Sequence, residues 1–206
     1  MHISDGVLPT SVTLAGFALT FAGAALSLKQ VRAEDLPRIA VVTSSFFVAS
    51  LIHLPFGPTS VHLLLPGIVG ALLGPVSFLS ITLGLFLQSI LFQFGGLTAL
   101  GANAMMMGLP AVFCGLLFRL LRGKTLKMHT IAGGLAGGLG TLLSAVILAA
   151  LLFTAGEDFL GVAKLALLAH LPVVCIEAGV SAFIISFLFR VKPELLNPGG
   201  FPRHDR

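Results

Sequence analysis

Long apolar stretches alternate with short polar breaks from Thr10 to Arg190. A bilayer core about 30 Å thick requires roughly 20 apolar residues of helix, and seven stretches bounded by charge, glycine or proline come near that length. We therefore expect an all-α, polytopic membrane protein. Its seven transmembrane helices are predicted at residues 10–28, 37–53, 62–74, 77–94, 104–121, 130–154 and 161–190.

Two of these predicted helices have unusual lengths. The third, 62–74, is short and contains Pro66, so a tilted or re-entrant segment is an alternative to a full crossing. The last, 161–190, is longer than one straight crossing needs and contains Pro172, which favours a kink or an interfacial first turn. No other segment is long enough for a second domain, so we expect a single domain over residues 1–206.

The composition excludes an ordinary soluble protein. Hydrophobic residues make up 56% of the chain, charged residues make up 10%, and the mean hydropathy is +1.05, whereas soluble domains are roughly 25% charged. A cleaved secretory signal is not expected, because the first eight residues lack Lys and Arg and the apolar run after them continues to Ser27. We therefore expect Met1 to be a residue of the mature chain.

The basic residues fall on one side of this predicted topology. If the N-terminus lies outside, 11 of the 12 Lys and Arg residues lie in or beside inward-facing loops and the C-terminal tail, as the positive-inside rule requires. Lys164 is the exception. We therefore expect an outer N-terminus and a cytoplasmic C-terminus. The inner residues are Lys29, Arg32, Arg38, Arg119, Arg122, Lys124, Lys127, Arg190, Lys192, Arg203 and Arg206.

The candidate chemistry lies on the opposite, outer face and begins with Met1-His2. An α-amine, the next amide and an imidazole at position 2 close a five-membered and a six-membered chelate ring with three nitrogens in one plane. An ion that displaces an amide proton and favours square-planar nitrogen donors is Ni²⁺ or Cu²⁺, with Co²⁺ a weaker fit. The outer face has no thiolate, which argues against Cu⁺.

The fourth nitrogen is expected from His62 or His53. Two prolines and a glycine predict an irregular loop between them, and His62 is predicted to begin the next helix. The alternative for His62 is a hydrogen bond to Thr59 or Ser60 in the first helical turn. The alternative for His53 is an interfacial cap at the end of the preceding helix.

Three further polar residues have more than one interpretation. Asn103 follows a glycine-rich segment and either caps the next helix or donates a hydrogen bond that fixes the N-terminal loop. Asp5 either orients the His2 imidazole or caps the first helix. Glu177 lies near the middle of the last predicted helix, where a carboxylate is costly and functional by default. It either forms an internal relay with His170 or is a hydrogen-bonded residue buried among helices.

Three segments of the sequence resemble the signatures of the CbiM/NikM family. They are residues 1–8 (MHISDGVL), 57–64 (GPTSVHLL) and 95–103 (GGLTALGAN), and the similarity extends from Met1 through at least Pro110. Members of this family are the cobalt- and nickel-specific S components of energy-coupling factor (ECF) transporters.

The resemblance implies a fold and a ligand set. It implies seven membrane helices, with the N-terminus folded into the core beneath the outer face. The metal ligands it implies are the Met1 amine, the amide and imidazole of His2, and the imidazole of His62. The residues expected to support these ligands are Asp5, Thr59, Ser60 and Asn103.

The resemblance also implies a division of labour. An S component in the inner (plasma) membrane of a prokaryote captures Co²⁺ or Ni²⁺ from outside, and two cytoplasmic ATPases drive uptake through a membrane coupling T component. The need for a small accessory membrane subunit is left open, as is the choice of metal. The sequence contains no Gly-x-x-x-x-Gly-Lys-Ser/Thr phosphate loop, so no ATPase activity of its own is expected. An organic cofactor and a nucleic-acid partner are not expected either.

The alternative function is a stand-alone secondary nickel or cobalt carrier. Such carriers resemble one another in a His-x-x-x-x-Asp-His pattern within a helix, and this sequence does not contain it. The subunit of a larger importer is therefore the favoured interpretation.

Overall fold

The computed structural model describes residues 2–56 and 59–197, with the backbone alone for residues 53–56, 59–62 and 158. These residues form seven α-helices and one β-hairpin, joined by short 3₁₀ turns. The helices are α1 (Thr10–Leu28), α2 (Leu36–Ala49), α3 (Pro66–Leu73), α4 (Ser77–Phe92), α5 (Leu100–Leu121), α6 (Leu126–Thr154) and α7 (Leu160–Val191). The strands are β1 (His53–Phe56) and β2 (Thr59–His62), and the 3₁₀ turns are Ala33–Asp35, Gly74–Val76, Glu157–Phe159 and Pro193–Leu196.

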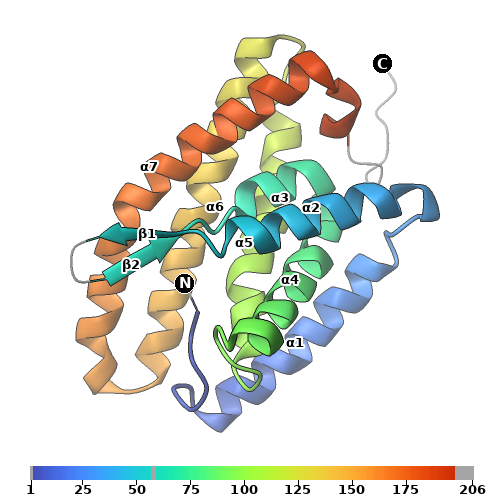
Figure 1. Ribbon diagram of the computed structural model, residues 1–206. Helices are drawn as coiled ribbons and strands as arrows, with labels where there is room; N and C mark the ends of the chain where they lie inside the picture. Colours follow the sequence, from blue (N-terminus) through green and yellow to red (C-terminus); the bar gives the residue numbers. More distant parts are fainter. Residues whose placement is uncertain (1, 57–58, 198–206) are drawn as a thin grey trace.

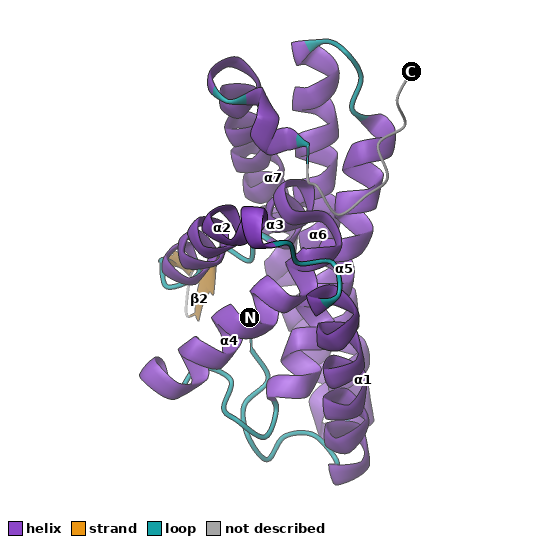
Figure 2. Cartoon of the chain, turned by 90° about the vertical axis from the view of Figure 1, so that its right-hand side faces the viewer, coloured by secondary structure: helices purple, strands orange, loops and turns teal. Residues whose placement is uncertain are grey.

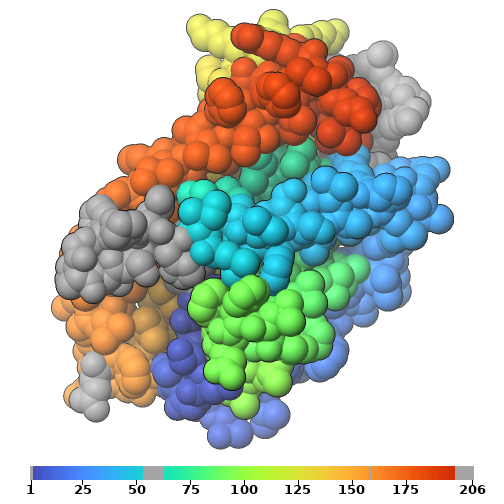
Figure 3. Space-filling model, viewed as in Figure 1, coloured from blue at the N-terminus to red at the C-terminus, as the bar shows by residue number. Residues whose placement is uncertain are grey.

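The helices pack around α5, which contacts α1, α3, α4 and α6. Helices α6 and α7 form a long antiparallel pair on one side of the bundle (Figure 1). Helix α2 crosses the surface between α7 and α4 (Figure 3). The N-terminal segment and the α4–α5 loop lie at one end of the molecule, and the α5–α6 connection lies at the other (Figure 1).

Five helical stretches are long and apolar enough to cross a bilayer. They are Thr10–Leu28, Pro66–Phe92, Leu100–Leu121, Leu126–Thr154 and Leu160–Val191. Helix α7 is continuous through Pro172, and α3 joins α4 across the Gly74–Val76 turn. At this level the predicted polytopic, helical class is confirmed. Helix α2 has 14 residues and α3 has 8, each shorter than a bilayer crossing needs, so seven crossings stay a prediction.

The segment between α2 and α3 differs from the prediction. The second predicted helix ends at Ala49 instead of residue 53, and the third begins at Pro66 instead of residue 62. Two antiparallel strands lie between them, with His53 opposite His62 in the register. The predictions that His53 ends a helix and that His62 begins one are therefore wrong.

Local chemistry explains this hairpin. Pro55 has no N–H for the helical ladder, and its ring would clash with the preceding turn of a helix. Thr59 and Val61 are β-branched, and β-branched side chains favour extended backbone. The all-α class holds for the rest of the described chain, and the hairpin is the exception that carries His62.

Helix α3 lies in direct backbone contact with both of its neighbours. A Cβ added at Gly67 would lie 2.0 Å from the carbonyl oxygen of Ala136 in α6, and one added at Gly70 would lie 1.9 Å from the carbonyl oxygen of Ala111 in α5. Only glycine permits such an approach. Because every residue of α3 except Leu72 is buried, this short helix is part of the core and fixes the distance between α5 and α6.

We predict that Gly70→Ala lowers the free energy of unfolding by about 3 kcal/mol or more, because the new methyl group meets backbone that cannot move aside. Gly179→Ala in α7 is the matched control, since nothing lies within 4 Å of its added Cβ, and it is expected to be neutral or slightly stabilising. Thermal unfolding in detergent micelles measures both. Equal stability of the two variants would contradict the close packing of α3 on α5.

Candidate metal site

The N-terminal segment, residues 2–9, turns back from α1 into the body of the bundle and comes near the β-hairpin in both views (Figures 1 and 2). Ile3 is 2% exposed. Its N–H donates to Oδ1 of Asn103 at 2.9 Å, and Nδ2 of Asn103 donates to its carbonyl oxygen at 2.9 Å. One carboxamide therefore satisfies both main-chain groups of the residue next to His2.

This pairing decides between the two interpretations of Asn103. Helix α5 begins at Leu100, with Ala99 at the N-cap position and no side-chain cap hydrogen bond. Asn103 lies in the first turn of α5, so its interpretation as a helix cap is wrong. The predicted hydrogen bond to the N-terminal loop is present, and its effect on a bound metal stays a prediction.

Asp5 attaches the same segment to the loop before α5. Its Oδ1 accepts hydrogen bonds from the Thr98 hydroxyl at 2.6 Å, the Thr98 N–H at 2.8 Å and the Ala99 N–H at 3.2 Å. The hydrogen bond from the Thr98 hydroxyl lowers the pKa of Asp5 below its ordinary value of 3.8; burial opposes this shift, and the main-chain N–H groups add to it. The interpretation of Asp5 as the cap of α1 is wrong, because α1 has no side-chain cap.

The glycine-rich loop closes over His2. Gly95 and Gly96 have φ values of +78° and +80°, which other residues rarely adopt. A Cβ added at Gly95 would lie 3.1 Å from Cβ of His2, and one added at Gly96 would lie 2.2 Å from Cγ of Asp5. The His2 ring stacks on Phe94 with 6.2 Å between centroids. The loop therefore holds the His2 side chain within the bundle.

His62 ends β2, and residues 63–65 lead directly to α3. Strand β2 contacts α7. The side chains of His62, Thr59 and Ser60 lie outside the described part of the structure, and so does Met1. The strand that carries His62 lies near the N-terminal segment in both views (Figures 1 and 2), and ligation by Met1, His2 and His62 stays a prediction.

Glu177 is the buried carboxylate for which the sequence allowed two interpretations. It is 0% exposed and accepts hydrogen bonds from the N–H groups of Leu64 and Leu65 and, at 2.7 Å, from the Thr141 hydroxyl. Nδ1 of His170 lies 2.6 Å from the carbonyl oxygen of Ala166 in its own helix. The interpretation of Glu177 as a hydrogen-bonded residue among helices is confirmed.

No competing metal cluster is found in the described residues: none of their His, Cys, Asp and Glu side chains form a group of three or more that could hold an ion. The expected ligand set differs from such clusters, because two of its four nitrogens belong to the main chain.

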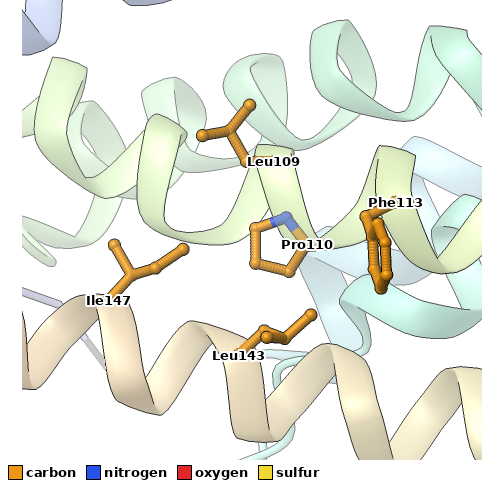
Figure 4. Close-up of a pocket in the computed structure, with 5 residues that line it drawn as sticks. All are labelled: Leu109, Pro110, Phe113, Leu143 and Ile147. Carbon is orange, nitrogen blue, oxygen red and sulfur yellow. The ribbon is translucent and has the colours of Figure 1, made fainter.

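A pocket between α5 and α6 has a lining of apolar side chains (Figure 4). It therefore offers no side-chain ligand for a divalent cation. Its lining residues are Leu109, Pro110, Phe113, Leu143 and Ile147.

Comparison with known proteins identifies the family of this chain. Residues 2–195 match the CbiM family model, described as the cobalt uptake substrate-specific transmembrane region. The chain belongs to the CbiM family. The resemblance carried by the three sequence segments is therefore confirmed.

Relatives of this CbiM-family protein are named for metal transport. A protein of Haemophilus influenzae with such a name is 39% identical over 204 residues, which cover 96% of this chain and 97% of the relative. The cobalt transport protein CbiM of Sorangium cellulosum is 29% identical, covering 96% of this chain and 95% of its own. The fused nickel transport protein NikMN of Rhodobacter capsulatus is 33% identical, covering 98% of this chain and 65% of its own.

Solved structures extend the comparison to the fold. The crystal structure of a truncated transition metal transporter has a TM-score of 0.74 and 26% sequence identity, covering 92% of this chain and 99% of its own. Together with the apolar helices, these findings make the protein a multi-pass membrane protein of a cobalt and nickel transport family.

We predict that Asn103→Ala speeds hydrogen exchange of the Ile3 amide about tenfold to hundredfold, because two buried main-chain groups lose their partner. Exchange with mass spectrometry of the N-terminal peptide measures this. Met106→Leu is the control, since it conserves volume at a buried residue of the same helix. Unchanged exchange in Asn103→Ala would show that the carboxamide does not hold the segment.

The Asp5 attachment is expected to depend on pH. Because the folded-state pKa is lowered, the stabilisation is complete above pH 3.8 and is lost as the pH falls through the depressed pKa. Pepsin cleavage within residues 2–9 should therefore rise below pH 3.8, relative to cleavage in the α5–α6 connection. In Asp5→Asn, cleavage within residues 2–9 should exceed that of the wild type at every pH from 2 to 5. A variant with the wild-type pH profile would contradict this assignment.

Proposed function

We propose that this protein is the substrate-binding subunit of an ECF-type importer, which captures Ni²⁺ or Co²⁺ at its outer face for ATP-driven uptake. The ligands are the Met1 amine, the amide and imidazole of His2, and the imidazole of His62. The ion is the transported substrate and loses its water ligands as four nitrogens replace them. No organic cofactor takes part.

One observation carries this proposal: the double hydrogen bond between Asn103 and Ile3. A metal chelate made of an amine, an amide and an imidazole needs a fixed main chain, because each torsion angle changes the distance between its nitrogens. The Asn103 carboxamide fixes the next residue, and Asp5 fixes the segment two residues later. A terminus held at these two points is preorganised to close around an ion.

The proposed chemistry makes capture dependent on protons. The amine and the amide bind the ion only after losing a proton, so binding releases protons to the outer solution and weakens as the pH falls. Release to the cytoplasm requires the chelate to open, which returns protons to the same nitrogens. The proposal therefore requires an energy source that opens a stable square-planar complex.

That energy source lies outside this chain, because the sequence has no phosphate-binding loop. We infer two cytoplasmic ATPases acting through a membrane coupling subunit, with a small accessory membrane subunit as a further candidate partner. The basic residues support the orientation that such partners need, with the N-terminus outside and the C-terminal tail in the cytoplasm. The proposed location is the inner membrane of a prokaryote.

We predict that a short Gly-Ser extension before Met1 lowers the Ni²⁺ affinity of the purified protein at least a hundredfold, because it removes the amine and lengthens a terminus that has to fit inside the bundle. The same extension after Arg206 is the control and should leave the affinity unchanged. Isothermal titration and the absorption spectrum of bound Ni²⁺ measure affinity and donor number.

High-affinity, four-nitrogen binding by the N-terminally extended protein would rule out the amine as a ligand. Accumulation of Ni²⁺ or Co²⁺ in vesicles that contain this chain alone would instead identify a stand-alone secondary carrier. The proposed subunit binds its ion alone and transports it only with its partners.

A further inference from the structure

The short connection between the hairpin and α3 has an unusual backbone. Leu65 has φ +54° and ψ +21°, a left-handed conformation that is unfavourable for a residue other than glycine. Leu64 and Leu65 are both buried, so water does not satisfy their main-chain groups. A connection of this kind keeps its shape only where the surrounding structure determines it.

Glu177 supplies hydrogen-bond acceptors for the buried N–H groups of this connection. Its Oε1 accepts from the N–H groups of Leu64 and Leu65, the latter at 3.0 Å, and its Oε2 lies 2.9 Å from the Leu65 nitrogen. The carboxylate also lies at the N-terminus of α3, where a helix has free N–H groups and a partial positive charge. A residue from α7 thus binds the main chain just before a helix that lies more than 100 residues away in the sequence.

The carboxylate is itself held in place. The Thr141 hydroxyl on α6 contacts Oε2 of Glu177 at 2.7 Å and the carbonyl oxygen of Gly137 at 3.2 Å. Removing a carboxylate from water costs several kcal/mol unless hydrogen bonds compensate, and these donors provide that compensation. The connection of residues 63–65 ends at α3, which the close contacts of Gly67 and Gly70 fix against α6 and α5. Its position at the other end, next to His62, is fixed by the hydrogen bonds to Glu177.

We propose that Glu177 is a positioning residue for the metal ligand His62, a role that rests on the function proposed above. Two residues of extended chain span at most about 7 Å, so a carboxylate bonded to the Leu64 N–H keeps the His62 backbone within a short, fixed reach. Glu177 does not touch the ion. Glu177 determines where strand β2 ends. The end of β2 in turn determines the position from which the His62 imidazole, the fourth proposed nitrogen ligand, reaches the ion.

The test compares Glu177→Gln with the wild type. Glutamine keeps the size of the side chain but has no charge and only one acceptor oxygen. The Leu64 and Leu65 N–H groups and the Thr141 hydroxyl, which two charged oxygens serve in the wild type, then compete for that single neutral acceptor, and hydrogen bonds to a neutral acceptor are weaker. We expect the Ni²⁺ affinity to fall about tenfold to hundredfold, as for other residues that orient metal ligands. The absorption spectrum of bound Ni²⁺ should change from four nitrogen donors to fewer, an effect that a loss of stability alone does not produce.

Ser181→Ala is the matched control. Ser181 lies one turn further along α7, is also 0% exposed, and follows the same buried face. It is expected to keep the wild-type affinity and spectrum. Wild-type affinity and a four-nitrogen spectrum in folded Glu177→Gln would overturn the positioning role. Absence of a four-nitrogen spectrum in the wild type would instead reject the proposed ligand set.

Thr141→Val decides the question if Glu177→Gln does not fold. It keeps the carboxylate and removes one of its hydrogen bonds, so the affinity should fall about threefold to tenfold. An unchanged affinity in this variant would overturn the proposal.

Discussion

Main-chain groups of non-helical segments have to be satisfied inside a membrane protein, because lipid offers them no hydrogen bonds. This constraint shapes the candidate site more than any metal ligand does. Asn103 satisfies Ile3, Asp5 satisfies Thr98 and Ala99, and Glu177 satisfies Leu64 and Leu65. In each case one polar side chain serves at least two main-chain groups of an irregular segment. The segments that carry the proposed nitrogens can therefore leave helical geometry while these main-chain groups stay hydrogen-bonded.

Close helix packing provides the frame in which these hydrogen bonds operate. Helix α3 is short, buried and held by backbone contact at Gly67 and Gly70, so it cannot shift without breaking contacts on both sides. Gly101 in α5 approaches α1 in the same way, since its added Cβ would lie 2.5 Å from the Phe17 nitrogen. The first turn of α5, which carries Asn103, is therefore as firmly placed as the core. Rigid elements thus hold both of the irregular segments that lead to the site.

The lengths of the apolar stretches predicted most of the fold, because lipid-facing and buried helices are both apolar while the loops between them are polar. The first helix has the predicted bounds, 10–28. The hairpin was missed because two prolines and a glycine between His53 and His62 favoured an irregular loop, and strands of four residues are too short to show a clear alternating pattern. Asn103 was identified as a candidate through its place after a glycine-rich segment. The contact between Glu177 and residues 64–65 could not be predicted, because no local pattern shows which distant backbone a buried carboxylate will meet.

A site built from main-chain nitrogens has a different weakness from one built from His or Cys clusters. Side-chain ligands tolerate small backbone shifts by changing rotamer, whereas an amide nitrogen moves only with the chain. Affinity in such a site depends on residues that never contact the ion, because they alone fix the backbone torsions. Asn103, Asp5 and Glu177 come from the start of α5, from the N-terminal segment and from α7, so three separate parts of the molecule determine one geometry. In the proposed site, a displacement of any one of them would change the spacing of the nitrogens, so any movement of these parts relative to one another would weaken the proposed chelate.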